Sequence, residues 1–151
     1  MATLFFDTSA LVKYYHPEVG SSVIESLFAE KAGLITISTL GMLETQSAFA
    51  IKVRSGQIDC GEAGGPRLRL MLDIASGTIQ TLALTPKHFS DAARLLSQYS
   101  YTVPLRTLDA LQLAVASELH VEQSLELFVA VDQRSIDVAR LEGLPVLDPR
   151  S

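Results

Sequence analysis

The chain has 151 residues, of which 48% are hydrophobic, and its formal net charge at pH 7 is −5. This length predicts a single domain, residues 1–151, with enough apolar sequence to bury a core. No apolar run approaches the roughly 20 residues that a membrane-spanning helix needs, so we expect no membrane segment. Asp7 and Lys13 interrupt the stretch where a signal peptide would need an unbroken apolar run, so we expect a cytoplasmic protein.

The composition also limits the chemistry. Cys60 is the only cysteine, which excludes an internal disulfide and a thiolate metal site. The glycine patterns of phosphate-binding loops, dinucleotide-binding loops and hydrolase nucleophile elbows do not occur. The negative charge argues against a passive nucleic-acid binder. However, if four of the 17 acids bind a cation, the remaining acids nearly balance the 12 basic residues. Any catalysis must therefore rest mainly on carboxylates.

Short β-branched and apolar runs alternate with longer segments of helical periodicity. The predicted strands, in chain order, are Thr3–Phe6, Leu34–Ser38, Ile79–Ala83, Leu127–Val131 and Pro145–Leu147. The predicted helices are Ser9–Tyr15, Val19–Lys31, Leu40–Ser55, Arg67–Ser76, Lys87–Tyr99, Leu108–Glu118 and Gln133–Glu142. We expect Gly64-Gly65-Pro66 to form a turn between two helices. The alternation indicates an α/β fold with a parallel sheet and helices on both faces, in which ligands bind outside the carboxyl ends of the strands.

Two aspartates follow predicted strands at that edge. Asp7 comes directly after the first strand, and Asp132 comes directly after the run LFVAV. Each has a purely structural interpretation, because Asp is a favoured N-cap and both residues precede a predicted helix. The alternative is that they meet other carboxylates in a common cleft.

Two further acids lie early in predicted helices. Glu44 shares its helical face with Ser47, Ala48 and Ile51 rather than with charged residues. Asp109 is in the first turn of LDALQLAVASEL, a helix that is apolar nearly all round and therefore expected to be buried. Asp109 could simply complement the dipole of that helix. We nevertheless expect both acids to point inward, toward the edge where Asp7 and Asp132 lie.

Four converging carboxylates would be costly without a counter-ion. Two like charges about 4 Å apart repel by roughly 4 kcal/mol at an effective dielectric of 20, whereas a whole domain is stable by about 5–15 kcal/mol. A divalent cation removes this cost, and Mg²⁺ and Mn²⁺ prefer oxygen ligands. Such an ion suits the hydrolysis of phosphodiester bonds.

Four stretches together carry a resemblance to a known family: FFDTSALVKYYHPEVGS, the segment around Glu44, TLDALQLAVA and FVAVDQRSIDVARLEGLPVL. They resemble the PIN-domain ribonucleases, and in particular the VapC-type toxins of type II toxin–antitoxin pairs. The resemblance implies an α/β/α sandwich with a mainly parallel central sheet. It also implies an endoribonuclease that cleaves RNA with Mg²⁺ or Mn²⁺, forms a homodimer, and is inhibited by an antitoxin that covers the cleft.

Carried over by position, the resemblance implies that the catalytic acids are Asp7, Glu44, Asp109 and Asp132. Asp7, Asp109 and Asp132 would hold the metal, and Glu44 would orient the attacking water. Ser9 matches a hydroxyl that the family often places two residues after its first acid.

Two positions depart from the family pattern, because Gln112 stands where a histidine is common and Ala130 where a hydroxyl residue is common. A basic rim for phosphate could come from Arg106 and Lys13, with Lys52 and Arg54 beside them. For each of these bases a solvated surface charge is the favoured interpretation, and Arg106, three residues before Asp109, is the best candidate for a phosphate contact.

Two other functions fit parts of the sequence. A phosphotransferase could use Asp7 as a phosphorylated nucleophile, but such enzymes need a second Asp two positions later, where this chain has Ser9. A PIN-like domain that binds RNA or protein without cutting is the main alternative. The presence of all four acids argues against it.

Overall fold

The computed structural model describes residues 2–62 and 64–151 of the chain. Within these residues it contains five strands and seven helices. The strands are β1 (Thr3–Phe6), β2 (Leu34–Ser38), β3 (Gln80–Leu82), β4 (Leu125–Val129) and β5 (Val146–Leu147). The helices are α1 (Thr8–Tyr15), α2 (Ser21–Glu30), α3 (Thr39–Arg54), α4 (Gly64–Ala75), α5 (Pro86–Tyr99), α6 (Thr107–Val121) and α7 (Gln133–Leu141).

The strands form one parallel sheet in the order β3-β2-β1-β4-β5. β1 is central, and its Leu4 pairs with Ile35 of β2 and Leu127 of β4. The chain extends the sheet from β1 first through β2 and β3, and then on the other side through β4 and β5. The strand order therefore reverses beside β1, which is the point where open α/β sheets bind their ligands.

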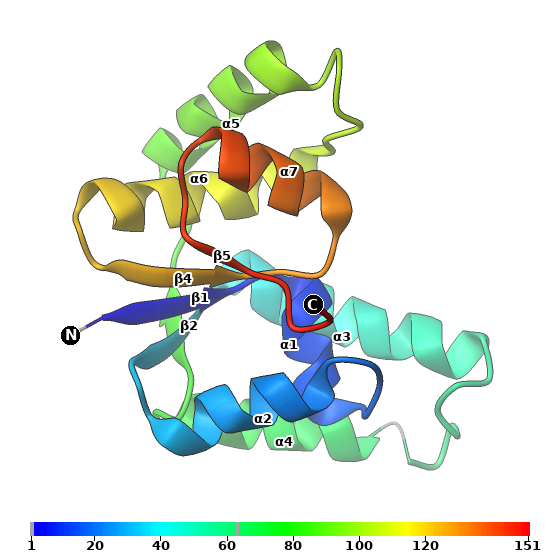
Figure 1. The fold of residues 1–151 in the computed structure, drawn as a ribbon. Coiled ribbons are helices and arrows are strands. Elements are labelled where there is room, and N and C mark those ends of the chain that lie inside the picture. The colour runs from blue at the N-terminus through cyan, green and yellow to red at the C-terminus, as the bar shows by residue number, and fades with distance from the viewer. Residues whose placement is uncertain (1, 63) are drawn as a thin grey trace.

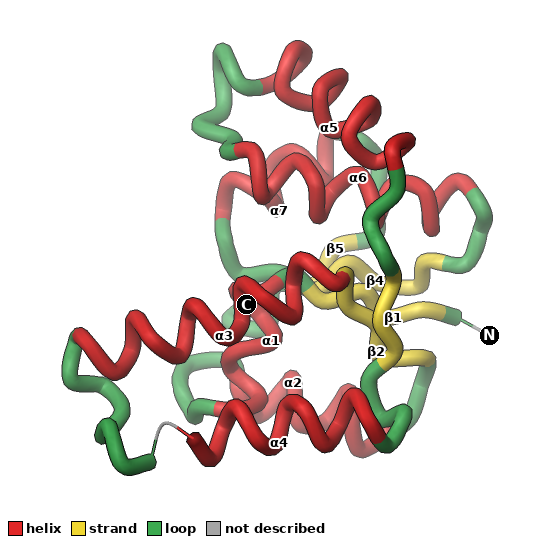
Figure 2. The backbone as a smooth tube through the Cα atoms, turned by 180° about the vertical axis from the view of Figure 1, so that it is seen from behind, coloured by secondary structure: helices red, strands yellow, loops and turns green. Residues whose placement is uncertain are grey.

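Side chains of the central strands alternate between two cores, as the period of a strand requires. Phe5 and Phe128 lie in the core that α5, α6 and α7 cover, whereas Leu4 and Phe6 lie in the core that α1, α2, α3 and α4 cover. Figure 1 shows α5, α6 and α7 on one side of the sheet and α2 and α4 on the other, and Figure 2 shows the same layers from behind. The predicted α/β/α sandwich is confirmed.

Helix α6 is the most deeply enclosed helix segment. Its residues Asp109 to Ala116 are all buried, which confirms the burial predicted from its apolar surface. In the part of the chain that the structure describes, no helix is both long and apolar enough to span a bilayer.

Two local predictions are wrong. β4 ends at Val129 rather than Val131, because Val129 pairs with Phe6, the last residue of β1. Asp132 therefore does not follow the strand directly. Gly64-Gly65-Pro66 begins α4 instead of forming a turn between two helices. A proline is tolerated there because the first N–H groups of a helix have no partner within the helix.

Candidate active site

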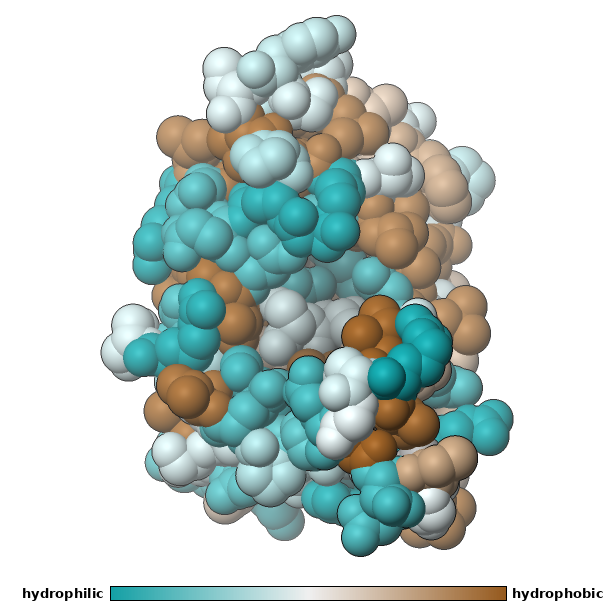
Figure 3. Space-filling model, turned by 90° about the vertical axis from the view of Figure 1, so that its right-hand side faces the viewer, coloured by the Kyte–Doolittle hydropathy of each residue, from teal (hydrophilic) through white to brown (hydrophobic). Residues whose placement is uncertain are grey.

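The carboxyl ends of β1, β2 and β4 lie at one edge of the sheet, and each is followed by the helix that starts there, α1, α3 and α7 respectively. Figure 3 views the molecule from this side. Its surface is hollowed near the centre, and hydrophilic side chains border the hollow.

Asp7 is buried directly after β1, with 5% of its surface exposed. It occupies the N-cap position of α1, yet its side chain makes no capping hydrogen bond within the described chain. Instead, Ser9 Oγ donates a hydrogen bond to Asp7 Oδ2 at 2.9 Å. Burial of this carboxylate is therefore not explained by helix capping.

Ser9 also connects two distant segments of the chain. Its Oγ accepts hydrogen bonds from the backbone N–H groups of Val131 at 3.0 Å and Asp132 at 3.2 Å. This hydroxyl holds the loop before α7 against the end of β1, and so brings Asp132 near Asp7.

Asp132 is a true N-cap, since its Oδ1 accepts a hydrogen bond from the backbone N–H of Arg134 at 3.1 Å. The capping interpretation is thus confirmed for Asp132 and not for Asp7. The Asp132 carboxylate also accepts hydrogen bonds from the guanidinium of Arg134, whose Nε lies 3.0 Å from Oδ1 and whose Nη2 contacts Oδ2.

Glu44 projects from α3 and is half-buried. Its Oε1 accepts hydrogen bonds from Gln112 Nε2 at 2.9 Å and from Thr8 Oγ1 at 3.3 Å. The orientation of the Gln112 amide is fixed, because Ser38 Oγ donates to Gln112 Oε1 at 2.8 Å. In turn, the backbone N–H of Gly41 donates to Ser38 Oγ at 2.9 Å.

Asp109 is buried in the first turn of α6. Its Oδ2 accepts a hydrogen bond from the backbone N–H of Arg106 at 3.1 Å, which ties the start of the helix to the preceding loop. The same oxygen lies 3.6 Å from Arg106 Nε and 3.7 Å from Arg134 Nε.

The acids influence one another electrostatically. Burial raises the pKa of Asp7 to about 7, the Ser9 hydrogen bond opposes the shift, and the charges of Glu44 and Asp109 add to it. Burial also raises the pKa of Glu44, against the hydrogen bonds from Gln112 and Thr8. The negative charges of Asp7, Glu44 and Asp109 therefore repel one another.

Comparison with known proteins identifies the family of the chain. The family model described as PIN domain matches residues 4–141. The chain belongs to the PIN domain family. Comparison with curated proteins gave no significant match.

Several solved structures share the fold of this PIN domain. VapC20 of Mycobacterium tuberculosis, described as a Sarcin-Ricin loop cleaving toxin, is 17% identical with a TM-score of 0.67, over 94% of this chain and 99% of that one. FitAcB from Neisseria gonorrhoeae is 17% identical with a TM-score of 0.67, over 97% of both chains. A toxin-antitoxin complex from Klebsiella pneumoniae is 18% identical with a TM-score of 0.61, over 97% of both chains.

The four acids of the PIN domain do not form a ready-made metal site. In residues 2–62 and 64–151, no three acidic, histidine or cysteine side chains lie close enough together to hold an ion. Arg134 and Arg106 pair with Asp132 and Asp109 instead. The expected nest of four carboxylates is therefore not preformed.

The donor set nevertheless fits a hard cation. Carboxylate oxygens are the ligands that Mg²⁺ and Mn²⁺ prefer. Asp7 is buried beside two other negative groups, which raise its pKa further. A divalent cation would relieve this repulsion once the guanidinium groups had moved aside.

The predicted basic rim is reduced to one residue. Arg106 lies at the acids, with Nη2 3.8 Å from Asp132 Oδ2. Lys13 is buried and pairs with Glu18 at 3.6 Å, and Lys52 pairs with the same carboxylate at 3.3 Å. Arg54 is exposed near the end of α3.

Sequence reasoning missed Thr8 and Arg134. Both adjoin predicted acids: Thr8 follows Asp7, and Arg134 comes two residues after Asp132. An arginine in the first turn of a helix is an available signal, because the positive end of the helix dipole disfavours it there.

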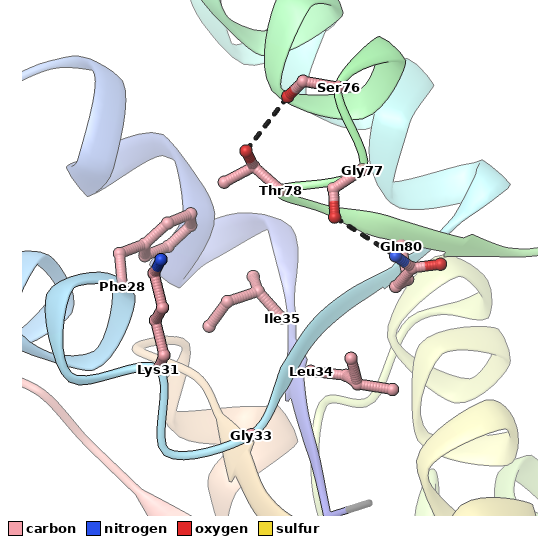
Figure 4. A pocket seen from close by; sticks show the side chains of 9 residues that line it. All are labelled: Phe28, Lys31, Gly33, Leu34, Ile35, Ser76, Gly77, Thr78 and Gln80. Atoms are coloured by element: carbon pink, nitrogen blue, oxygen red, sulfur yellow. Dashed lines mark hydrogen bonds between the residues drawn. The ribbon is translucent and has the colours of Figure 1, made fainter.

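Two of the hollows on the described surface differ in their position relative to the acids. A groove of about 420 Å³ adjoins the acids and is lined by Thr8, Leu40, Leu43, Glu44, Ser47, Ala48, Ile51 and Leu108. A second pocket of about 320 Å³ lies at the amino end of β2, between Phe28, Lys31 and the segment Ser76–Gln80, as Figure 4 shows. Only the groove includes one of the acids.

Proposed function

We propose that this PIN domain is a divalent-metal-dependent endoribonuclease that hydrolyses RNA phosphodiester bonds, and that it is the toxin of a toxin–antitoxin pair. The observation that carries the proposal is the buried Asp7, whose side chain makes no capping bond among the described residues and is repelled by the charges of Glu44 and Asp109. A structural role does not account for grouping these charges, whereas metal-dependent phosphodiester cleavage does.

In this proposal Asp7, Asp109 and Asp132 are the residues that would hold Mg²⁺ or Mn²⁺. The ion would lower the pKa of water and stabilise charge on the phosphate. Ser9 would keep Asp7 and the loop before Asp132 at a fixed separation, through its three hydrogen bonds.

Glu44 is the proposed general base. The pKa of Glu44 is raised toward neutral pH, and a general base is most effective when its pKa lies near the pH at which the enzyme works. Gln112 and Thr8 both donate to Oε1, so Oε2 remains available to orient and deprotonate the attacking water. Arg106, whose side chain is 67% exposed, would present its guanidinium to the RNA phosphate.

The substitution Asp7→Asn tests this assignment. We expect the purified variant to lose RNA cleavage in Mg²⁺ or Mn²⁺ by at least about 100-fold, because a ligand carboxylate is removed. Asp137→Asn is the matched control, since Asp137 is an exposed aspartate on α7. Cleavage by Asp7→Asn at the wild-type rate would contradict the metal-site assignment, and no cleavage by wild type would favour the non-catalytic alternative.

The antitoxin is the proposed protein partner. The groove beside Glu44 carries the exposed apolar side chains of Leu43, Ile51 and Leu108. A segment of an antitoxin that placed apolar residues there would also cover Glu44. Structures of similar fold include toxin-antitoxin complexes, which supports this proposal. Co-purification with the product of a neighbouring short reading frame, and inhibition by it, would test the partnership.

A further inference from the structure

Arg134 occupies both oxygens of Asp132. Its backbone N–H and Nε lie 3.1 Å and 3.0 Å from Oδ1, and its Nη2 contacts Oδ2. This is the two-pronged geometry in which a guanidinium binds a carboxylate most firmly. Both carboxylate oxygens of Asp132 are therefore bound to Arg134 in this structure.

The same guanidinium reaches a second acid. Arg134 Nε lies 3.7 Å from Asp109 Oδ2, so one side chain neutralises two of the three proposed metal ligands. Arg134 is largely shielded from solvent, with 27% of its side chain exposed. Arg106 lies about as close to Asp109, with its Nε at 3.6 Å, but it is farther from Asp132, at 3.8 Å, and 67% of its side chain is exposed.

Helix stability does not explain this arginine. Arg134 is the second residue of α7, where the helix dipole disfavours a positive charge. The cap itself needs only the backbone N–H of Arg134, which any residue except proline supplies. The guanidinium therefore stabilises the charges of Asp132 and Asp109 and does not stabilise the helix.

We propose that Arg134 competes with the divalent cation for Asp132, and so sets the concentration of cation at which the site fills. The inference rests on the function proposed above. Without a cation, the guanidinium balances the charges of Asp132 and Asp109. When a cation binds, the side chain rotates away from Asp132, while the backbone N–H of Arg134 keeps the cap, so that α7 need not move.

Titration calorimetry with Mn²⁺ in the absence of RNA tests this competition without depending on cleavage. We expect Arg134→Gln to bind Mn²⁺ about fivefold more tightly than wild type, the upper end of what one partly exposed ion pair contributes. Its unfolding midpoint in chelator should fall, because Asp132 and Asp109 lose their counter-charge. Arg134→Lys keeps the charge without the two-pronged contact, so it should bind Mn²⁺ about twofold more tightly.

Arg140→Gln is the matched control, because Arg140 is an exposed arginine on the same helix. We expect its affinity for Mn²⁺ to equal that of wild type. Should Arg134→Gln fail to fold, the lysine variant decides the question.

If the Arg134 variants bind Mn²⁺ no more tightly than wild type does, the proposed competition is wrong, although the proposed metal site is not contradicted. Failure of every variant and of wild type to bind millimolar Mn²⁺ would instead contradict the proposed function, and the competition with it.

Discussion

Asp7 should make the stability of the metal-free protein depend on pH. The folded-state pKa of Asp7 is raised to about 7 from an ordinary value of 3.8, so between these pH values the folded state binds more protons than the unfolded state. Stability must then fall as pH rises through this window. Glu44, whose pKa is also raised, acts in the same direction.

We expect the free energy of unfolding in chelator to drop by roughly 2–3 kcal/mol between pH 5 and pH 8, and Asp7→Asn to remove most of that drop. Urea titrations at the two pH values measure both quantities. A wild-type protein that is equally stable at pH 5 and pH 8 would show that the pKa of Asp7 is not raised in the folded state.

Individual residues of the site were predictable where the chain places them beside regular elements. Asp7 and Asp109 follow from the end of a strand and the first turn of a helix, and Glu44 from a helical face without other charges. Thr8 and Arg134 were not predictable in the same way, because their roles depend on which rotamer reaches across to a neighbouring acid. The charge of Lys13 suggests a place in the phosphate-binding rim, whereas in the structure Lys13 pairs with Glu18.

At the scale of elements, Gln112 connects α6 to α3. Gln112 is 1% exposed, and its Oε1 accepts a hydrogen bond from the hydroxyl of Ser38, the N-cap of α3. Its Nε2 donates to Glu44 in the second turn of α3. Gln112 is therefore a residue that holds the proposed base, Glu44, in place.

We expect Gln112→Ala to lower RNA cleavage by about 10–100-fold, the usual cost of removing a group that orients an active-site residue. It should also destabilise the fold by about 1–3 kcal/mol, because Ser38 is left without its buried acceptor. Gln98→Ala, at an exposed position of α5, is the control. Full activity in Gln112→Ala, measured alongside its unfolding curve, would remove Gln112 from the site.

The type and the order of the helices and strands were predictable from the sequence, whereas the first and last residues of some of them were not. The continuously apolar run LFVAV predicts a strand that starts two residues later than β4, which begins at Leu125 and includes the exposed Glu126. Pairing of Leu125 with Thr3 sets that start, and a pairing partner across the sheet is not visible in the local pattern. Asp132 consequently reaches the site through the cap of α7 and the Ser9 hydrogen bonds.

At the scale of the whole molecule, exposed apolar residues point to a surface for self-association. Leu68, Met71 and Leu72 on α4 are 60%, 41% and 57% exposed, and a run of such side chains is unusual on a free surface. We expect the wild-type protein to be a homodimer, and we expect Leu72→Glu to be a folded monomer whose stability no longer depends on protein concentration. Light scattering on purified protein measures this, with Leu141→Glu, at an exposed leucine of α7, as the control. A monomeric wild type would refute it.

The sandwich as a whole followed from the alternation of strands and helices, because parallel strands need helical crossovers that then cover both faces of the sheet. The groove beside Glu44 did not follow, since it depends on how far α3 extends past the sheet and on which of its leucines are left exposed.

Cation-dependent cleavage of RNA by the purified wild-type protein is the most direct measurement. Total RNA should stay intact in chelator, be cut when Mn²⁺ or Mg²⁺ is added in excess, and stay intact again with Asp7→Asn under the same conditions. Cutting that continues undiminished in chelator would contradict a metal-dependent site built from Asp7, Asp109 and Asp132.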